Sequence, residues 1–378
     1  MASPKPTSQK RDVAPLIHFD SDLRYLLGHT DGKFERATHR EVIMENDPVM
    51  ALLYAPIPER LWHYTSVAGS GGIISSRSIW ATDVRCLNDA QEFVNIRGTL
   101  QQCIDDASET EAYGFPCKDI VKWAVTEILK SDFMNPDSAQ IFVASFSEAS
   151  DDLHQWQHYT HDECGVSIGF DLRAFRPPKE SGLAVTLASC VYEKNQKENL
   201  VRSSLEHFVS ATRTAWTGTA HQFLRDVAQT GIKPTFEQIS GVTNFVFGSK
   251  EFKDAARIGL FEMKTRVFRL AGLFKHEAFF HEQEWRLVLP LSPGKDKTNL
   301  VHPIQYRKGR TLAEIPYIAF PLGVTNIGET PEDAHLPIVD MMLGPLSSET
   351  ALQENNNFLN AQNIPVVAHR SQIPLRRT

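Results

Sequence analysis

The order of its predicted strands and helices restricts the fold of this chain more than any other feature. Short β-prone runs come first, a stretch with helical periodicity follows at residues 196–275, and further β-prone runs come after it. Strands that do not alternate one by one with helices favour an α+β fold. The predicted strands are Leu61–Thr65, Ile79–Thr82, Ile141–Ser147, Gly165–Phe170, Leu187–Tyr192, Glu284–Leu291, Tyr317–Phe320 and Val339–Leu343.

Helices are predicted at several places outside that stretch. Ser66–Ser76 contains a turn and a short helix, and residues 90–129 carry apolar positions at helical spacing. The run Ser150-Asp151-Asp152 is an N-cap signal for a helix over Leu153–Thr160. A helical pattern also occurs around Phe34–Met44.

Composition and charge exclude several classes of protein. The 378 residues are 42% hydrophobic, enough for a substantial core. We expect a flexible leader at 1–15 and a single domain at 16–378, with a helical insertion at about 196–275. A net charge of −7 argues against a broad basic surface for nucleic acid. The five cysteines form no CxxC pair, and there is neither a secretory signal nor a membrane-spanning run, so we expect a cytoplasmic protein without membrane contact.

Two glutamates begin the strand that follows the helical stretch. Glu282 and Glu284 are two residues apart, so on a strand both would project from the same face. Each carboxylate raises the pKa of the other unless a positive charge lies nearby. That charge is either Arg286, one step further on the same face, or a cation that develops during a reaction. The first alternative is structural and the second is catalytic.

Three other groups of side chains suit a ligand. His63 is either a packed core residue or a donor to ligand hydroxyls. Ser145 and Ser147 share a strand face, where they either satisfy local backbone groups or line a site for a ribose. Trp156 and Tyr159 are at i,i+3 on one helix, so they either join the core or present a flat surface to a planar cationic ring.

Three further patterns have a functional and a structural interpretation. His154 and His158 are one helical turn apart with His161 beyond, which suits zinc or a solvated helical face. The segment Gly69-Ser70-Gly71-Gly72 forms a turn or lets the backbone approach a pyrophosphate. The basic residues within Lys253–Lys275 form a solvated face or contact a polyanion.

Taken in order, these segments resemble a bacterial family catalogued as domain of unknown function 2971. The resemblance extends over roughly residues 60–350. The blocks that carry it are His63-Tyr64-Thr65 with Asn88-Asp89 and Glu92, Phe146-Ser147-Glu148 with Gln155-Trp156 and Tyr159, Gly165-Val166 with Ile168-Gly169-Phe170-Asp171, Val191-Tyr192 with Gln196, Glu282-Gln283-Glu284-Trp285-Arg286-Leu287, and Met342-Leu343-Gly344-Pro345.

That family is similar to the ADP-ribosyltransferases, and the similarity implies a split antiparallel β-sheet core with surrounding helices and a cleft for NAD. It implies that Glu284 and Glu282 are both catalytic and that no metal is needed. Glu284 would be the catalytic glutamate, and Glu282 the first acid of an ExE pair, in which a second carboxylate could act as general base towards the acceptor. Tyr159, supported by Trp156, would form the aromatic wall against nicotinamide. The residues implied in binding NAD are His63, Tyr64, Thr65, Ser145, Ser147, Trp156 and Tyr159.

The function implied by the resemblance is NAD-dependent ADP-ribosyl transfer to a protein or a nucleic acid, by a bacterial toxin or phage-defence effector with a neutralising antitoxin as a further partner. Under this hypothesis the helical insertion selects the acceptor. Three alternatives stay open: an NAD glycohydrolase, a non-catalytic module that binds a nucleotide or a partner and whose acidic pair is held by Arg286, and a metal-dependent hydrolase built on the three histidines.

Overall fold

A computed structural model describes the chain at residues 47–87, 92–111, 114–130, 141–160, 164–173, 185–229, 242, 245–291, 303–308, 314–323 and 335–375. All described residues lie within Met44–Thr378, which forms one compact unit. The predicted leader and the helical pattern around Phe34–Met44 lie outside the described residues.

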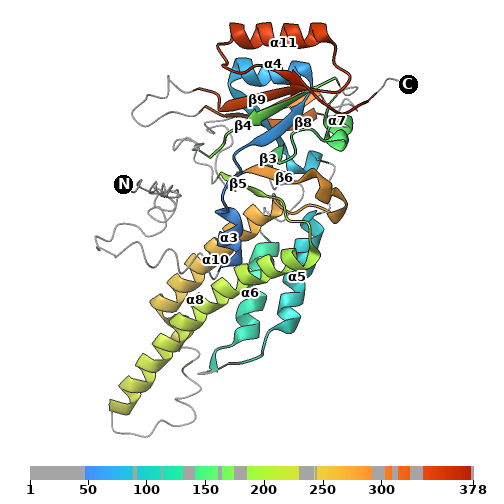
Figure 1. The fold of residues 1–378 in the computed structure, drawn as a ribbon. Coiled ribbons are helices and arrows are strands. Elements are labelled where there is room, and N and C mark those ends of the chain that lie inside the picture. The colour runs from blue at the N-terminus through green and yellow to red at the C-terminus, as the bar shows by residue number, and fades with distance from the viewer. Residues whose placement is uncertain are drawn as a thin grey trace, which may run out of the picture. The chain divides into compact units, whose positions relative to one another are not determined.

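Ten strands form one mostly antiparallel sheet (Figure 1), in agreement with the predicted α+β class. The order is β10-β9-β4-β1-β3-β2-β8-β7, and β6 pairs with both β3 and β5. All eight predicted strands are present, whereas β7 and β10 were not predicted. The strands are β1 (Leu61–Thr65), β2 (Ser78–Asp83), β3 (Ile141–Ser147), β4 (Val166–Phe170), β5 (Thr186–Ser189), β6 (Glu284–Pro290), β7 (Ile304–Lys308), β8 (Glu314–Pro321), β9 (Ile338–Leu343) and β10 (His369–Arg370).

The sheet divides at β3. One edge of β3 pairs with β6 along its whole length. On the other edge, Phe142 and Val143 pair with β2, whereas Ser147 pairs with Trp62 of β1. Residues 144–146 have no strand partner on that edge among the described residues. The strands β1 and β2 therefore separate at this point, and α4 (Val67–Ser76) connects them.

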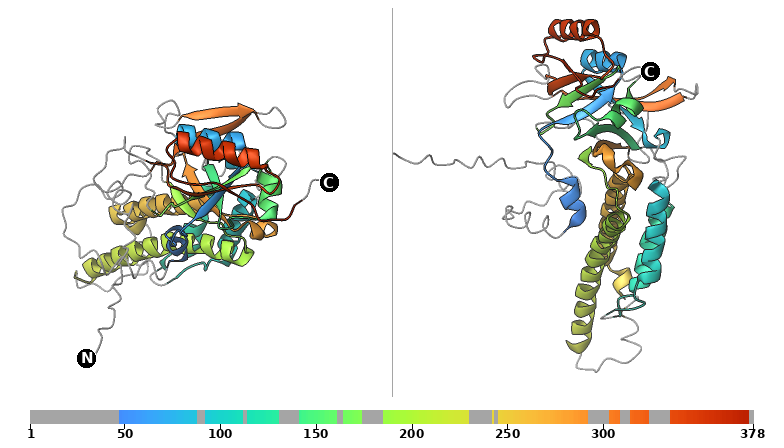
Figure 2. Two further views of the ribbon diagram at one scale, coloured as in Figure 1. Left: turned by 45° about the horizontal axis from the view of Figure 1, so that its top comes forward. Right: turned by 45° about the vertical axis from the view of Figure 1, so that its right-hand side comes forward.

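Helices cover both faces of the sheet (Figures 1 and 2). Side chains alternate along β3, so Phe142 and Ala144 join the core beneath α4 and α11 (Glu349–Ala361). Ile141 and Val143 join the core shared with the helices of the other face. Those helices are α5 (Glu92–Asp106), α6 (Cys117–Leu129), α8 (Lys194–Gln229) and α10 (Lys250–Ala271).

The helical insertion consists of α8 and α10, which lie side by side in every view (Figures 1 and 2). Gly259 allows this contact, because a Cβ there would lie 3.1 Å from the ring of Phe208. The remaining helices are α3 (Pro48–Leu53), α7 (Leu153–Tyr159), and the 3-10 turns η1 (Val84–Cys86) and η6 (Glu277–Glu282). In the described part of the chain, none of these helices combines the length and the apolar character that crossing a bilayer requires.

Candidate functional site

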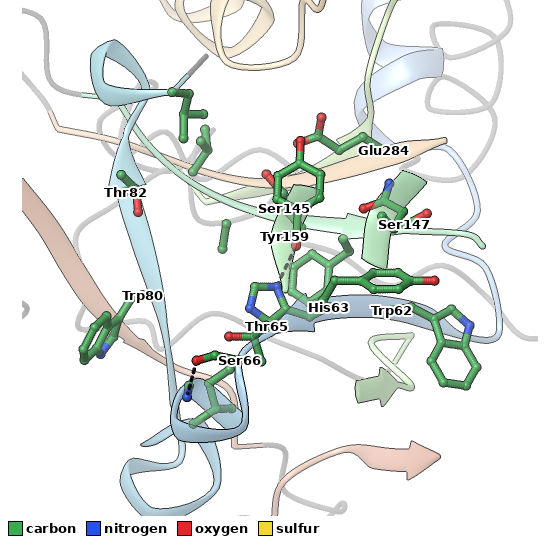
Figure 3. A pocket seen from close by; sticks show the side chains of 18 of the residues that line it. Trp62, His63, Thr65, Ser66, Trp80, Thr82, Ser145, Ser147, Tyr159 and Glu284 are labelled. Carbon is green, nitrogen blue, oxygen red and sulfur yellow. Dashed lines mark hydrogen bonds between the residues drawn. The ribbon is translucent and has the colours of Figure 1, made fainter. Parts of the chain in front are cut away.

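A cavity of about 530 Å³ lies where β1 and β2 separate from β3 (Figure 3). A cavity of this size suits a small-molecule ligand. The cavity wall contains eight of the nine predicted site residues, and the ninth, Trp156, is fully buried outside it. The eight residues are His63, Tyr64, Thr65, Ser145, Ser147, Tyr159, Glu282 and Glu284.

The two glutamates meet in a different way from the one predicted. Glu282 ends η6 and Gln283 takes a left-handed conformation with φ 44°, so only Glu284 belongs to β6. The prediction that both project from one strand face is therefore wrong. Their carboxylates converge on Lys275, whose Nζ lies 2.5 Å from Glu282 Oε2 and also donates to Glu284 Oε2.

Arg286 provides the second positive charge of this cluster. Its Nε donates to Glu284 Oε1 at 2.8 Å, and its Nη1 donates to the Gly272 carbonyl at 3.2 Å, just beyond α10. Each of the four charged side chains is at most 4% exposed, so the two carboxylates and the two cations balance in a nearly dry environment. The glutamates belong to the cavity wall, whereas Lys275 and Arg286 do not.

These contacts keep Glu284 and Lys275 ionised. Burial alone would raise the pKa of Glu284, but Arg286 and Lys275 lower it to about 2 through their charges and hydrogen bonds. Burial would lower the pKa of Lys275, but the nearby Glu284 and the other acidic groups hold that pKa above its usual value. Glu284 is therefore an anion and Lys275 a cation at neutral pH.

The helix α7 holds Glu282 from the other side. Asp152 caps α7 by accepting from Gln155 N, as predicted. The Tyr159 hydroxyl donates to both carboxylate oxygens of Glu282, at 3.1 and 3.0 Å. Burial raises the pKa of Tyr159, so its hydroxyl stays protonated at neutral pH. Its side chain is 41% exposed and supplies an aromatic wall to the cavity.

The two predicted serines have different surroundings. The Ser147 hydroxyl donates to the Glu282 carbonyl at 2.7 Å and accepts from Ala149 N at 3.1 Å. Of the two alternatives that the sequence left open, Ser147 thus satisfies local backbone groups. Ser145 lines the cavity, and its carbonyl lies on the edge of β3 that has no strand partner.

His63 occupies that gap in the sheet. Its Nδ1 lies 2.9 Å from the Ser145 carbonyl, which can only accept, so Nδ1 carries the proton. Burial lowers the pKa of His63 more than this hydrogen bond raises it. The imidazole is therefore neutral at pH 7, and its Nε2 is an acceptor for a ligand hydroxyl.

Tyr64, which lines the cavity, and Trp156, which does not, hold α7 in position. The Tyr64 hydroxyl donates to the Ala149 carbonyl at 2.9 Å and accepts from Asp152 N at 3.1 Å. Its ring packs edge-on against Trp156, with 4.8 Å between ring centroids. Trp156 also donates from Nε1 to Asp151, so it positions α7 and does not face a ligand.

The short helix predicted within Ser66–Ser76 is present as α4, and the glycine-rich segment lies inside this helix instead of forming a turn. Ser66 caps α4 by accepting from Gly69 N at 3.0 Å, and the glycines form the first turns of the helix. A Cβ on Gly69 would lie 2.2 Å from Thr65 Oγ1, which explains the need for glycine there. Because Ser66, Gly69 and Gly72 line the cavity, the N-terminal end of α4 faces it with a partial positive charge.

Sequence reasoning missed several residues of the cavity wall. Gln155, whose Nε2 donates to the Glu282 carbonyl at 3.3 Å, was not predicted as a site residue. Trp80 and Thr82 of β2 and Arg307 of β7 also line the cavity. The strand β7 is largely exposed and polar, so hydrophobic alternation gave no signal for it.

The structure bears on the histidine pattern and on one residue of the basic pattern. His154 and His158 stack with their rings 4.0 Å apart, and His161 lies outside the described residues. Within the described ranges, no group of three or more potential metal ligands occurs. The expectation of a solvated or polyanion-binding face over Lys253–Lys275 is wrong for Lys275, which is buried and paired with two carboxylates.

Residues 155–287 match a family described as "Protein of unknown function (DUF2971)". The matched segment includes Tyr159 and the whole charged cluster from Lys275 to Arg286. No curated protein and no solved structure matches the chain.

Proposed function

We propose that this protein cleaves the nicotinamide–ribose bond of NAD and transfers the ADP-ribosyl group to a macromolecular acceptor, either a protein or a nucleic acid. The observation that carries the proposal is the cavity in which Glu284, Glu282, Tyr159, Ser145 and His63 come together from separate segments. A role as a toxin or phage-defence effector with a neutralising antitoxin belongs to the same proposal.

The arrangement of charges around Glu282 and Glu284, called the acidic end of the cavity below, supports this chemistry. Cleavage of the bond leaves positive charge on the ribose, and an ionised carboxylate beside it stabilises that charge as it develops. Glu282 and Glu284 line the cavity, whereas Lys275 and Arg286 do not belong to its wall. Coulomb energy falls with distance, so a cation that forms in the cavity is attracted to the nearer carboxylates more than it is repelled by the cations.

The roles of the two glutamates follow from their surroundings. With a pKa of about 2, Glu284 stays ionised at neutral pH and suits charge stabilisation better than proton abstraction. Glu282 accepts hydrogen bonds from both Tyr159 and Lys275. We assign Glu282 to holding the phenol of Tyr159, whose exposed ring would pack against nicotinamide.

The other parts of the cavity suit the rest of the dinucleotide. His63 Nε2 is an acceptor for a ribose hydroxyl. The N-terminus of α4, which carries Ser66 and Gly69 into the wall, favours a pyrophosphate through its backbone N–H groups and its dipole. The donors and acceptors of the chain thus fit NAD without a metal ligand.

Incubation of the purified protein with adenine-labelled NAD and cell lysate tests the proposal, after separation of protein, DNA and RNA. We expect label on one of these fractions, and a Glu284→Gln variant that is about 100- to 1,000-fold slower. The matched control is Glu354→Gln, at an exposed position of α11, which should match the wild type. Absence of both labelled macromolecules and free ADP-ribose would contradict the proposal, and free ADP-ribose alone would indicate an NAD glycohydrolase.

A non-catalytic module that binds a nucleotide or a partner is the second candidate. The observation in its favour is the ion pair between Arg286 and Glu284, which gives the carboxylate a structural role. Under this alternative the wild type and a Glu284→Gln protein that is still folded would show the same NAD turnover, at the background rate.

A further inference from the structure

The cavity has a second end, built by residues that the acidic chemistry does not use. Trp80 of β2 is 47% exposed, and the guanidinium carbon of Arg307 lies 5.7 Å from the centroid of its ring. Arg307 also donates from Nη2 to Thr82 Oγ1 at 3.2 Å, so β7 and β2 are joined there. Figure 3 shows Trp80 and Thr82 on one side of the cavity and Tyr159 and Glu284 on the other.

The strand registers place this end on the same sheet face as the acidic end. Glu284 is opposite Ser147, and Thr82 is opposite Val143, so residues at every second position from these share one face. Neighbouring strands are about 4.8 Å apart, so the steps from β6 through β3 to β2 separate the backbones of Glu284 and Trp80 by roughly 10 Å or more. One ligand that fills the cavity can therefore contact both ends.

The chemistry of Trp80 and Arg307 suits an aromatic base that carries a phosphate. An indole ring offers a stacking surface, and a guanidinium both stacks on aromatic rings and pairs with phosphate oxygens. Among the described residues, Arg307 has no carboxylate partner, so its charge is available to an anion. Tyr317 supports the indole, with ring centroids 4.6 Å apart.

We infer that Trp80 and Arg307 bind the adenosine-phosphate half of a dinucleotide, with adenine on the indole and the adenosine phosphate on Arg307. The inference rests on the proposed function only for the identity of the other half. The N-terminus of α4 also lines the cavity, with Ser66 near Thr65 in Figure 3, and we expect the linking phosphates to pass there. A nucleic-acid strand would require a row of cations, whereas Arg307 is the sole arginine or lysine among the described wall residues.

Titration calorimetry of the full chain with AMP tests this site without any cleavage of NAD. We expect Trp80→Leu to weaken AMP binding by roughly 5- to 150-fold, the range of base–aromatic stacking. Arg307→Met should also weaken it, through loss of the phosphate contact. Trp123→Leu is the matched control, because Trp123 is 41% exposed on α6, outside the cavity wall. Nicotinamide mononucleotide is the matched ligand, and its affinity should not change in Trp80→Leu.

The outcomes separate this inference from the proposed function. Loss of AMP binding in both variants supports the site even if the wild type never cleaves NAD. Where NAD is cleaved, both variants should raise KM and leave kcat near the wild-type value. An absence of AMP binding by the wild type at millimolar concentration overturns the inference, and so does an unchanged AMP affinity in both variants. Loss of binding to a single-stranded oligonucleotide with AMP affinity intact would assign the surface to an acceptor and also overturns it.

Discussion

The buried position of Glu284 predicts a stability that depends on pH in a defined window. Its pKa falls from an ordinary value of 4.5 to about 2 in the folded protein, because Arg286 and Lys275 outweigh the effect of burial. A difference of about 2.5 pH units corresponds to about 3 kcal/mol of folding free energy. A folded-state pKa below the unfolded value means that this stabilisation is complete above about pH 4.5 and is lost as the pH falls towards 2.

Glu284→Gln should therefore lower the free energy of unfolding by about 3 kcal/mol at pH 7. This lies at the lower end of the cost of removing one partner of a buried ion pair, about 3–5 kcal/mol. A reason is that Arg286 keeps its bond to the Gly272 carbonyl and Lys275 keeps Glu282.

Urea unfolding of both proteins, followed by tryptophan fluorescence at several pH values between 7 and 3, measures this difference. We expect it to be constant from pH 7 to 5 and to shrink steadily below pH 4.5. Glu354→Gln, at its exposed position, should match the wild type throughout. A difference between Glu284→Gln and the wild type that stays equal from pH 7 to pH 3 would refute the reasoning, because the lost stability would then not come from an ionised carboxylate.

Three further changes test other contacts. Lys275→Met leaves two buried carboxylates with one cation, so denaturant unfolding should show a loss of about 3–5 kcal/mol. Tyr159→Phe keeps the ring but removes the hydroxyl that donates to Glu282 and holds the ring in place. We therefore expect steady-state NAD turnover to fall while the melting temperature changes little. Gly165→Ala would place a Cβ 2.4 Å from the Thr65 carbonyl and should cost about 1–3 kcal/mol in urea unfolding, whereas Gly71→Ala on α4, with no atom within 4 Å, should not destabilise.

Local patterns predicted most of the sheet because its central strands are buried. The predicted bounds of β3, Ile141–Ser147, are those observed, since nearly every position of this strand is apolar or buried. β7 was missed because it is mostly exposed and polar. α11 was missed for a similar reason: its buried positions are Asn355 and Leu359, too few to form an apolar stripe.

The candidate site was predictable in its residue types and less so in its geometry. The acidic pair stood out because like charges seldom occur two residues apart at a strand. The conformation of Gln283 then places Glu282 outside β6, a change that period-two counting cannot anticipate. Nothing in the sequence indicated that Lys275 pairs with Glu282 and Glu284. Lys275 lies in an irregular segment after α10, and in the sequence it resembles the other basic residues around that helix.

If the helical insertion selected only the acceptor, as the sequence hypothesis has it, exchanging the insertion should spare NAD cleavage, but the contacts of the insertion with the charged cluster argue against this. The residues just after α10 supply Lys275 and the Gly272 carbonyl that Arg286 binds. Lys197 at the start of α8 donates to the Lys275 carbonyl at 2.5 Å. Removal of the insertion would therefore disturb the charged cluster as well as any surface that selects an acceptor.

The two ends of the cavity differ in what a mutation can reveal. At the acidic end, the charged side chains are nearly dry and join β6 to the helical insertion, so each change there alters both stability and chemistry. At the other end, Trp80 is 47% exposed and Arg307 is also exposed, so their replacement should cost little folding free energy. An effect of Trp80→Leu on ligand affinity can therefore be attributed to binding, whereas an effect of Glu284→Gln requires the unfolding free energy to be measured alongside. Evidence for a dinucleotide in this cavity is thus easier to obtain from the aromatic end, even though the proposed bond cleavage takes place at the acidic one.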